Sequence, residues 1–437
     1  MNSETLARAV ITRLRSAGHQ AWLVGGCVRD LMLGVQPKDF DISTDARPDR
    51  IMDLFPNSGR VGAHFGVVLV RDLFCQVEVA TFRSDHDYED GRRPASVHFE
   101  TDPRADVLRR DFTINGLMMD PDTGLVLDYV DGRADLDRRV VRAIGDPDAR
   151  FGEDHLRLLR AIRFAARLGF AIDPETLAAI RRHHALIRRV SAERVRDELV
   201  RILVEGGARR GFELLDDSGL LGDLLPEVAA MKGVEQPPEF HPEGDVWVHT
   251  LLLLEKLDRP TPALALGALL HDVGKPPTFR VAERIRFDGH VEEGVRLAHD
   301  ILHRLRFSRD DMEQVEALVE NHMRFKDVGR MKESTLKRFL RLPHFDEHLE
   351  LHRLDALSSN GQLESYDLVK SKLVELSEEH LKPAPLLTGA DLIAAGYEPG
   401  PQFAKILAAV EDAQLEGRIH TAGEAVALVR EQFPEGR

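Results

Sequence analysis

The alternation of hydrophobic and polar positions changes character several times along the chain. Between about residues 20 and 135, short β-rich runs (AWLVGG, GVVLVRD and FCQVEVATF) alternate with helical stretches, which predicts an α/β region. From about residue 136 to 215 the apolar residues recur at i, i+3, i+4 and i+7, as in HLRLLRAIRFAARLGF, which predicts helices. The Pro- and Gly-rich PEFHPEGD then indicates a break.

The second half of the chain is also predicted to be helical. Residues 245–357 combine helical periodicity with many histidines, and LLTGADLIAAGYEPGPQF has Gly and Pro residues that separate two helices. We therefore expect an α+β fold, in which a mixed sheet with helices is followed by mostly helical parts. The predicted domains are residues 1–135, 136–215, 216–360 and 361–437.

Composition narrows the class of protein. The 437 residues are 43% hydrophobic, enough for more than one core. The two cysteines, Cys27 and Cys75, cannot build a disulfide framework, and no Cys-x-x-Cys pair offers a zinc site, which fits a reducing cytoplasm. The N-terminal MNSETLARAVITRLRSAGHQAW lacks the apolar core of a signal peptide, and no apolar run is long enough to cross a bilayer. We expect a soluble, cytoplasmic protein without a membrane partner.

The net charge of −15 hides an uneven distribution. Arg138–Arg210 contains 17 arginines and 10 acidic residues, a local balance of +7 in an acidic chain. Such a basic belt can follow the phosphates of a nucleic acid. The alternative is a helical surface on which arginines pair with neighbouring acids.

A first candidate site begins in AWLVGGCVRDLMLG, which is predicted to be a strand, a tight Gly25-Gly26 turn and a helix. Glycines allow a ligand to approach the backbone closely, and the helix start offers free N–H groups to phosphate. Asp39 and Asp41 follow in KDFDI. On a strand they face the same way, with Phe40 on the opposite, buried side. Paired carboxylates of this kind suit Mg²⁺ better than zinc.

A third carboxylate, Glu78 in CQVEVATF, lies on a predicted strand that could complete the ligand set. Two metal ions held by three carboxylates are what an in-line phosphoryl displacement needs. The alternative is a surface strand with solvated aspartates, since Asp-x-Asp alone is short and common. The preceding strand, glycine turn and helix favour the metal site.

Four ordered blocks resemble the class II nucleotidyltransferases, the bacterial CCA-adding enzymes and poly(A) polymerases of the polymerase-β superfamily. The blocks are VGGCVRD, DFDI, RRDFTING and EDHLRLLRAIRFAARLGF, and they span about half of the chain. The resemblance implies a polymerase-β-like nucleotidyltransferase head that holds catalytic metals, a helical neck that selects the nucleotide, and a body and tail that bind tRNA.

The neck carries a candidate base selector. If residues 154 and 157 lie one turn apart on a helix, Asp154 can accept from an exocyclic amino group while Arg157 donates to a ring nitrogen. Cytosine and adenine both present this pattern, whereas uracil and guanine reverse it. The Asp154–Arg157 pair can therefore reject uracil and guanine. The resemblance assigns this role to Asp154 and Arg157. The alternative is a surface salt bridge.

Further candidate nucleotide-binding residues are Gly25, Gly26 and Arg29 in the turn and its helix, and Arg110, which resembles a family position near the nucleotide and could otherwise be a charge at a strand edge. Arg160 and Arg163 continue the basic face and could meet the triphosphate or RNA. The polar segment 84–102 is similar to the family's flexible loop, which enzymes that add only CC tend to shorten, and could equally be an ordinary surface connection.

A second metal site is indicated further along the chain. The order His, His-Asp, Asp, with further histidines between, resembles the HD phosphohydrolases, in which such side chains bind one or two divalent metals and activate a water. Because adjacent residues on a helix point about 100° apart, the metal has to lie near the helix end. The expected ligands are His249, His271, Asp272, His290, His322 and Asp355.

These features predict a CCA-adding enzyme that uses CTP, ATP, Mg²⁺ at the head, an unidentified divalent metal at the HD site, and the 3′ end of tRNA. No feature implies a protein partner. The alternatives are an A-adding enzyme and a poly(A) polymerase, although the latter often carry a long basic C-terminal extension and this chain ends in GEAVALVREQFPEGR. A different class is an HD phosphohydrolase whose head is inactive and only binds RNA.

Overall fold

The computed structural model describes residues 2–60, 66–88, 94–239, 241–376 and 381–434. Contacts between residues divide the chain into two units. The first comprises Met1–Ala229 with Arg304–Arg306, and the second comprises Ala230–His303 with Phe307–Arg437. The predicted head and neck both lie in the first unit.

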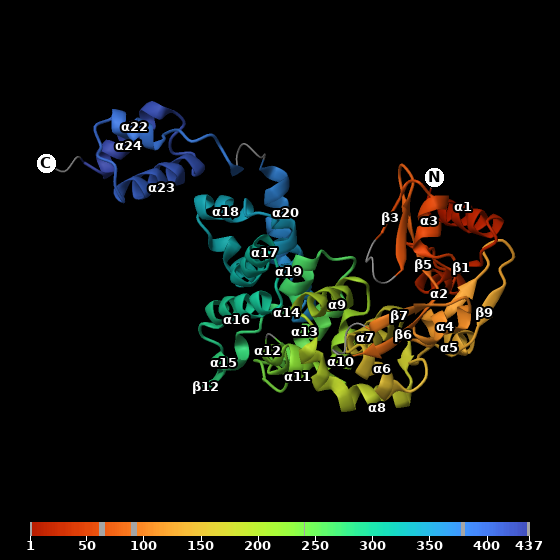
Figure 1. Ribbon diagram of the computed structural model, residues 1–437. Helices are drawn as coiled ribbons and strands as arrows, with labels where there is room; N and C mark the ends of the chain where they lie inside the picture. Colours follow the sequence, from red (N-terminus) through yellow and green to blue (C-terminus); the bar gives the residue numbers. More distant parts are fainter. Residues whose placement is uncertain (1, 61–65, 89–93, 240, 377–380, 435–437) are drawn as a thin grey trace. The chain divides into compact units, whose positions relative to one another are not determined.

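A mixed sheet forms the centre of the head, with strand order β3-β4-β5-β2-β1-β8-β9 (Figure 1). The strands are β1 (Ala21–Val24), β2 (Asp41–Thr44), β3 (Ser58–Arg60), β4 (Val67–Arg71), β5 (Gln76–Thr81), β8 (Leu117–Met119) and β9 (Val126–Asp128). Strand β2 runs antiparallel to β1 and parallel to β5, so the sheet is mixed, as predicted. The three β-rich runs of the sequence supply β1, β4 and β5.

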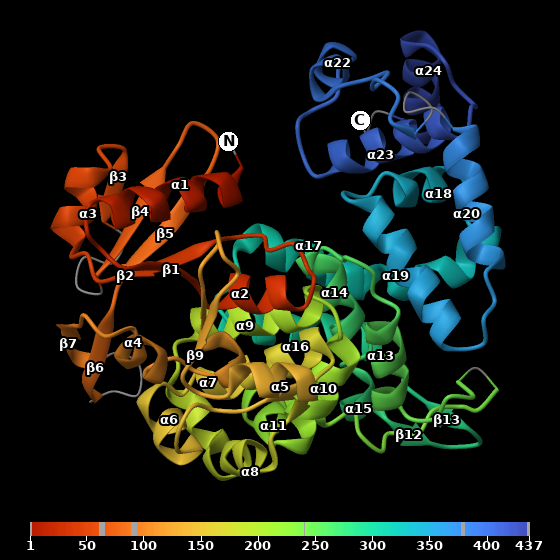
Figure 2. The same cartoon turned by 90° about the vertical axis from the view of Figure 1, so that its right-hand side faces the viewer.

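Helices α1 and α3 contact each other and pack against strands of this sheet (Figure 2). The head helices are α1 (Ser3–Ser16), α2 (Gly26–Met32), α3 (Pro48–Leu54) and α4 (Pro103–Leu108). Helix α1 begins where the Asn2 side chain accepts a hydrogen bond from the Thr5 backbone N–H. Its buried residues Leu6, Val10 and Leu14 recur at helical spacing, which explains how it covers the sheet.

Much of segment 84–102, predicted as a loop, is an antiparallel hairpin. Its strands are β6 (Arg83–Tyr88) and β7 (Pro94–Phe99). The polar sequence of this segment lacks the alternating apolar pattern that indicates a strand, so the pairing of β6 with β7 was not predicted. Residues 89–93, at the predicted loop's centre, lie outside the described part of the chain.

The neck is predominantly helical, as predicted. The elements of the first unit from the end of the head sheet onwards are α5 (Gly132–Arg138), α6 (Pro147–Glu153), α7 (Arg157–Leu168), α8 (Pro174–His183), η2 (His184–Arg189), α9 (Ala192–Val204), α10 (Ala208–Asp217), α11 (Leu220–Leu224) and α12 (Pro226–Ala229), of which α11 and α12 lie beyond the predicted neck. Helix α7 is mostly buried, packs against α9 and α10, and ends at Gly169 with a φ of 64°. A short parallel pair, β10 (Val140–Val141) and β11 (Ala171–Ile172), interrupts the helices.

The second unit begins with a helical part whose core includes α13, α14, α17 and α19. Its elements are α13 (Val246–Glu255), α14 (Pro262–Leu270), α15 (Lys275–Thr278), α16 (His290–Arg304), α17 (Arg309–Asn321), η3 (His322–Arg330), α18 (Glu333–Leu340), α19 (Phe345–Ser358) and α20 (Glu364–Glu375), with a small hairpin of β12 (Arg280–Val281) and β13 (Ile285–Arg286). Within the residues described, no helix is both long and apolar enough to cross a membrane.

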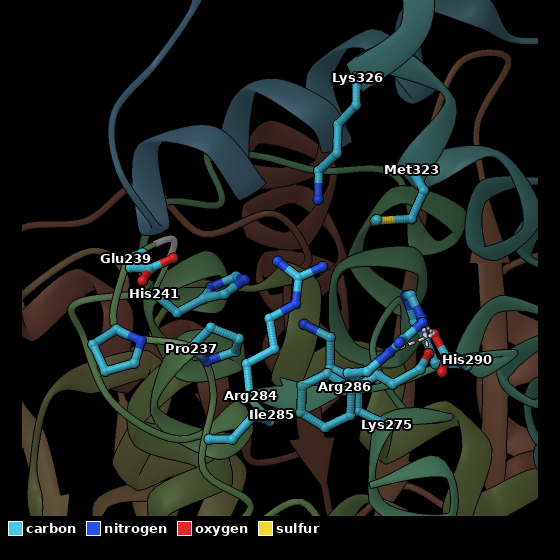
Figure 3. Close-up of a pocket in the computed structure, with 13 residues that line it drawn as sticks. Pro237, Glu239, His241, Lys275, Arg284, Ile285, Arg286, His290, Met323 and Lys326 are labelled. Carbon is cyan, nitrogen blue, oxygen red and sulfur yellow. Dashed lines mark hydrogen bonds and ion pairs between the residues drawn. The ribbon is translucent and has the colours of Figure 1, made fainter. Parts of the chain in front are cut away.

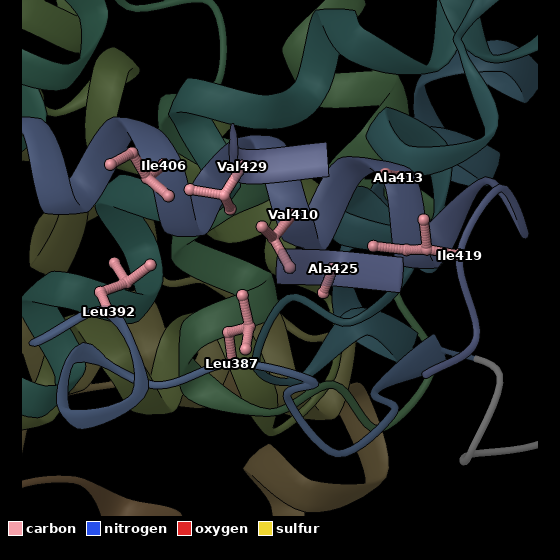
Figure 4. Close-up of a cluster of buried hydrophobic side chains, with 8 residues drawn as sticks. All are labelled: Leu387, Leu392, Ile406, Val410, Ala413, Ile419, Ala425 and Val429. Carbon is pink, nitrogen blue, oxygen red and sulfur yellow. The ribbon is translucent and has the colours of Figure 1, made fainter. Parts of the chain in front are cut away.

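The tail has a small hydrophobic core of its own. Helices α22 (Gly389–Ala394), α23 (Gln402–Leu415) and α24 (Ala422–Gln432) surround it, so the helices predicted on either side of the Gly- and Pro-rich segment are confirmed. Figure 4 shows side chains from the three helices and their connections meeting in this core. Leu392, Ile406, Val410 and Val429 are each at most 3% exposed.

Candidate functional site

The turn between β1 and α2 is built around Gly25. Its backbone has a φ of 73°, a conformation that strains residues with a side chain. A Cβ at this position would also lie 3.1 Å from Nη1 of Arg110. The predicted strand, glycine turn and helix are therefore confirmed, and the positive φ together with the close approach of Arg110 explains the glycine.

Two of the predicted metal-binding carboxylates lie side by side on the head sheet. Asp41 is the first residue of β2, and its partner in the parallel register of β5 is Glu78. Paired residues on neighbouring strands point to the same face, so the two side chains project together. Asp39 lies in a bend before the strand rather than on it as predicted, because β2 pairs with β1 only from Asp41 onwards. Phe40 is 3% exposed, as predicted.

The carboxylates carry negative charge that is only partly balanced. Burial, together with the charges of Glu78 and Asp39, raises the pKa of Asp41 to about 6, and the charge of Arg110 opposes this rise. Asp39 and Glu78 are exposed. A set of oxygen donors that repel one another fits a divalent cation, which would relieve the repulsion.

Arg110 is fixed next to these carboxylates by hydrogen bonds. Its Nη2 donates to Asp106 Oδ2 at 2.9 Å and to Ser43 Oγ at 3.2 Å. Burial would raise the pKa of Asp106, but Arg110 and Arg109 hold it at about 2. Neither Asp106 nor Ser43 was predicted from the sequence. Asp106 could have been found, because it precedes the two arginines at helical i,i+3 and i,i+4 spacing.

Arg29, predicted to bind nucleotide, is embedded in the protein. It is 2% exposed, and its guanidinium donates to Asp30 Oδ1 at 2.6 and 2.8 Å and to Asn115 Oδ1 at 2.7 Å. Its guanidinium carbon also lies 5.1 Å from the centroid of the Phe164 ring. These contacts join α2 to the segment before β8 and to α7, so Arg29 holds the glycine turn against the neck. Its contact with nucleotide stays a prediction.

Asp154 occupies a different position from the one predicted. It follows the end of α6 with an extended backbone, φ −139°, while α7 begins at Arg157, so the two residues do not share one helix. Asp154 Oδ1 accepts from the Leu156 backbone N–H at 3.1 Å, a local bond that competes with helix continuation. Arg194 of α9 donates to the Asp154 oxygens at 3.0 and 3.2 Å. Arg194 was not predicted from the sequence, because it is one of many arginines in the basic belt.

Arg157 links the neck directly to the head. Its Nη2 donates to the backbone carbonyl of Arg109 at 3.1 Å, and its Nη1 donates to Glu153 Oε2 at 2.5 Å and to the Arg150 carbonyl at 3.1 Å. Arg109 precedes Arg110, whose charge acts on Asp41. One short segment therefore connects the predicted base selector with the carboxylate site.

Arg160 and Arg163 of α7 form ion pairs with acidic residues elsewhere in the first unit. Arg160 donates to Asp111 Oδ2 at 2.6 and 2.9 Å, and Arg163 donates to Glu198 Oε2 at 2.6 Å. Burial would raise the pKa of Asp111, but Arg160 holds it at about 2. The alternative interpretation of the basic belt, arginines paired with acids, applies to these two positions. Contacts of Arg160 and Arg163 with triphosphate or RNA stay predictions.

The second unit brings all the predicted HD-site residues into one cluster. The cluster contains two sets of three residues, and within each set the potential ligand atoms lie within 4.8 Å of one another. One set is His249, His271 and Asp355, and the other is Asp272, His290 and His322. Asp272 faces both sets, with Oδ2 3.2 Å from His271 Nε2 and Oδ1 3.7 Å from His322 Nε2. Helix α14 ends at Leu270, so the His-Asp pair lies at a helix end, as its divergent side chains require.

Backbone carbonyls orient the imidazoles of this cluster. The Nδ1 atoms of His271, His290 and His322 lie 3.0, 2.9 and 2.7 Å from carbonyls of Ala268, Phe287 and Val319. This arrangement turns Nε2 inward, and Nε2 of His290 and of His322 is buried without a hydrogen-bond partner. Burial lowers the pKa of His322 to about 3, which keeps its ring neutral. The neutral His322 ring, with its Nε2 lone pair turned inward beside carboxylates, fits a ligand of a divalent metal ion.

Several neighbours of this cluster were not predicted from the sequence. His249 Nδ1 lies 2.6 Å from Glu243 Oε1, and His241 Nδ1 lies 2.9 Å from the same oxygen. Lys275 Nζ donates to Asp272 Oδ2 and to Gln236 Oε1, both at 2.6 Å. The PEFHPEGD segment was interpreted only as a break. His241 and Glu243 in this segment, shortly before the predicted ligand His249, could have indicated that it belongs to the site.

Comparisons with known proteins match the chain to three family models in order. Residues 21–142 match the "Poly A polymerase head domain", residues 169–232 the "Probable RNA and SrmB-binding site of polymerase A", and residues 245–355 the "HD domain". The three models together cover most of the head, much of the neck and the His–Asp cluster of the second unit.

Curated relatives named CCA-adding enzyme align with different shares of the chain. The Levilactobacillus brevis protein is 45% identical over 215 residues, 49% of this chain and 54% of its own length. The Lactobacillus gasseri protein is 38% identical over 267 residues, 59% of this chain and 66% of its own length. These alignments thus span about half to two thirds of the relatives. The Streptococcus pneumoniae protein is 30% identical over 427 residues, 98% of this chain and 97% of its own length.

Solved structures share the fold. The Bacillus stearothermophilus CCA-adding enzyme in complex with CTP matches with a TM-score of 0.77 and 25% identity, over 99% of this chain and 98% of that chain. The Thermotoga maritima CCA-adding enzyme complexed with tRNA matches with a TM-score of 0.60 and 20% identity, over 99% of this chain and 96% of that chain. The predicted α+β fold with a nucleotidyltransferase head and an HD domain is confirmed.

Proposed function

The chain belongs to the family of CCA-adding enzymes, and we propose that it adds C and A nucleotides from CTP and ATP to the 3′ end of tRNA. The observation that carries this proposal is the connection between base selector and carboxylate site. Arg157 donates to the Arg109 carbonyl at 3.1 Å, and the next residue, Arg110, lies where its charge acts on Asp41. A base held by Arg157 and Asp154 is thereby tied to the site where its phosphate reacts.

Base selection follows from the donor and acceptor groups of the pair. The Asp154 carboxylate accepts from the exocyclic amino group of cytosine or adenine, and the Arg157 guanidinium donates to the adjacent ring nitrogen. Uracil and guanine place a carbonyl oxygen against Asp154 and an N–H against Arg157, which leaves both unmatched. Arg194 holds the Asp154 carboxylate in place through two bonds.

Asp39, Asp41 and Glu78 are the residues that would hold Mg²⁺ at the head. Divalent cations held there would lower the pKa of the attacking 3′ hydroxyl and neutralise the leaving pyrophosphate. Arg110, kept charged by Asp106, is placed to bind a phosphate of the nucleotide, and Gly25 leaves space for it. We also assign the protein to the cytoplasm, where its two free cysteines stay reduced.

Incorporation into three tRNA transcripts tests the proposal. The transcripts end before CCA, after C and after CC, and each receives CTP or ATP alone. We expect C to be added to the first two and A to the third, because one selector pair accepts both bases. Failure to add C to the first transcript, with A added to the third, would replace CCA addition by A addition alone. Repeated A addition to any RNA end would indicate a poly(A) polymerase.

A second activity is favoured by the metal cluster of the second unit, whose two donor sets both face Asp272. We propose that this site hydrolyses phosphate esters, with a divalent metal held by the six HD-site residues activating water. We expect turnover of a 2′,3′-cyclic nucleotide with Mn²⁺, Ni²⁺ or Co²⁺. The Asp272→Asn variant should lose roughly 10²-fold or more of this turnover and keep nucleotide incorporation.

Asp258→Asn is a suitable control, because the Asp258 side chain is 84% exposed. It should leave hydrolysis within twofold of the unmodified protein. Circular dichroism of both variants checks that the second unit folds. The absence of turnover with all three metals would contradict the hydrolytic activity and leave the nucleotidyltransferase proposal untouched.

A further inference from the structure

One carboxylate oxygen joins two histidines beside the metal cluster of the second unit. Glu243 Oε1 lies 2.6 Å from Nδ1 of His249 and 2.9 Å from Nδ1 of His241. Burial would raise the pKa of Glu243, but hydrogen bonds, that of His249 foremost, lower it and keep the carboxylate charged. A charged carboxylate only accepts hydrogen bonds, so both Nδ1 atoms carry a proton and donate it. Nε2 is then the atom with which His249 can bind a metal ion.

A glycine after Glu243 explains how this carboxylate comes to lie against α13. Gly244 has a φ of 122°, a backbone conformation that residues with a side chain rarely adopt. The next residue, Asp245, caps α13, because its side chain accepts from the Val248 backbone N–H at 2.7 Å. The chain therefore turns sharply just before the helix, which places Glu243 beside His249 near the helix start.

His249 differs from the other imidazoles of the cluster in the charge of its partner. Nδ1 of each of the other three lies against a neutral backbone carbonyl. A carboxylate fixes the orientation of the ring as a carbonyl does, and its charge also makes the opposite nitrogen a stronger metal ligand. Nε2 of His249 lies 3.1 Å from Asp355 Oδ1 and 3.3 Å from His271 Nε2, within its ligand set. Glu243 is thus placed to strengthen one member of that set.

The charge of Glu243 is balanced by no lysine or arginine of the described residues. Its side chain is 7% exposed, its ion pairs are with His241 and His249 alone, and Oε2 is buried without a hydrogen-bond donor. A buried negative charge is costly unless positive charge lies close by. His249 connects this charge to the point where the ligand atoms gather, so a divalent cation at Nε2 would balance it across the ring.

His241 extends this arrangement to a cavity of about 490 Å³ beside the cluster. Figure 3 shows His241 on the cavity wall, together with the predicted ligand His290. The rings of His241 and His249 meet edge to face, with their centroids 4.9 Å apart. Since both rings donate to the same oxygen of Glu243, a molecule that displaces His241 changes the negative charge available to His249. The carboxylate therefore couples the cavity wall to a metal ligand.

We propose that Glu243 is a positioning residue of the HD site, which holds the His249 ring with Nε2 toward the metal ion and strengthens that nitrogen as a ligand. The inference rests on the metal-dependent hydrolysis proposed for this site and names a residue, outside the six ligands, on which the metal affinity depends. Glu243 itself touches neither the metal ion nor the substrate.

Calorimetric titration of the metal-free full chain with Mn²⁺ tests this inference. The binding step that Asp272→Asn abolishes identifies the HD site and separates it from the head. Glu243→Gln should weaken Mn²⁺ affinity at the HD site about tenfold, because the amide oxygen still accepts from Nδ1 but has no charge. Glu243→Ala should weaken it about 100-fold, because the orientation of the ring is lost as well. Glu235→Gln is the matched control, since Glu235 is an exposed glutamate in the same segment and should change nothing.

The absorption spectrum of the Co²⁺-loaded chain separates positioning from folding and from ligation. At saturation, Glu243→Gln should hold as many cobalt ions as the unmodified chain, measured by elemental analysis, and its visible bands should shift because one nitrogen donates differently. Loss of a whole metal ion at saturation would make Glu243 a ligand and overturn the inference. Mn²⁺ affinity within twofold of the unmodified chain in both Glu243 variants, or an equal loss in Glu235→Gln, would also overturn it.

Hydrolysis of a 2′,3′-cyclic nucleotide, measured on the same samples, distinguishes this inference from the function on which it rests. Excess Mn²⁺ should restore most of the hydrolysis to Glu243→Gln, since metal occupancy limits it; failure to restore it would overturn the positioning role. Metal affinity that depends on Glu243, without hydrolysis by the unmodified chain, would remove the hydrolytic function and keep the positioning role. Hydrolysis with metal affinity indifferent to Glu243 would do the reverse.

Discussion

Replacing Asp41 with asparagine should lower nucleotide incorporation into tRNA by roughly 10³-fold or more. Asp41 faces Glu78 across paired strands and is the most buried of the three head carboxylates, so its loss removes a central donor of the proposed metal site. The amide keeps the size of the side chain but has no negative charge to hold a divalent cation. Single-turnover incorporation of labelled CMP, at saturating tRNA, measures the effect.

Asp53→Asn is the matched control for this experiment. Asp53 is an exposed aspartate on α3, so its replacement should leave incorporation within twofold. Binding of tRNA to Asp41→Asn, measured by filter retention, should stay close to that of the unmodified chain. Incorporation that survives in Asp41→Asn would refute the metal assignment. It would favour the alternative in which the head only binds RNA and the HD site is the catalytic centre.

Replacing Asp154 with asparagine should reduce kcat/KM for CTP and ATP by about 10²-fold and relax discrimination against UTP and GTP. The carboxylate only accepts hydrogen bonds, whereas the amide can donate one to the carbonyl oxygen of uracil or guanine. The variant should therefore lose its advantage for C and A while gaining some use of U and G. Steady-state incorporation with each of the four nucleotides on a transcript ending before CCA provides the measurement.

The Arg194→Gln variant distinguishes a residue that contacts the base from one that only positions Asp154. Arg194 donates to both oxygens of Asp154, and in our proposal it does not itself touch the base. Loss of the Arg194 guanidinium should lower kcat/KM for CTP and ATP about tenfold, as for other residues that orient a functional group. The ratio of kcat/KM for CTP to kcat/KM for UTP should stay the same. Equal discrimination in Asp154→Asn and the unmodified enzyme would contradict the selector role, whatever the rate.

The head shows how far short motifs predict geometry. The glycine turn followed the local pattern of a strand, two glycines and a helix, and the positive φ of Gly25 explains the choice of residue. The spacing of Asp39 and Asp41 predicted a shared face, yet the strand begins only at Asp41. Strand ends depend on where the neighbouring strand starts to pair, and β1 pairs with β2 from Asp41. Periodicity within one segment does not contain that information.

The neck shows more clearly that spacing within one segment does not predict tertiary contacts. Helical spacing placed Asp154 and Arg157 on one face, but a side-chain bond from Asp154 to the Leu156 N–H interrupts the helix between them. The partner that holds Asp154 is Arg194, on another helix. Among the many arginines of the neck, nothing in the local sequence distinguishes this one, because its role depends on how α9 packs beside α7.

The sequence by itself determined the order of chemical groups in this protein. It indicated a carboxylate pair after a glycine turn, an acid and an arginine at the start of a buried helix, and a series of histidines and aspartates in HD order. It also predicted the mixed α/β head and the helical parts that follow. These features are local, since each depends on side-chain type and spacing within one or two turns or strands.

Only the tertiary structure decided which groups meet. It tied Arg157 to the Arg109 carbonyl beside the carboxylates, turned both oxygens of Asp272 toward different histidines, and placed His241 and His290 on the wall of one cavity. Such contacts join residues far apart in the chain, and they follow from the packing of whole elements rather than from any pattern within one of them.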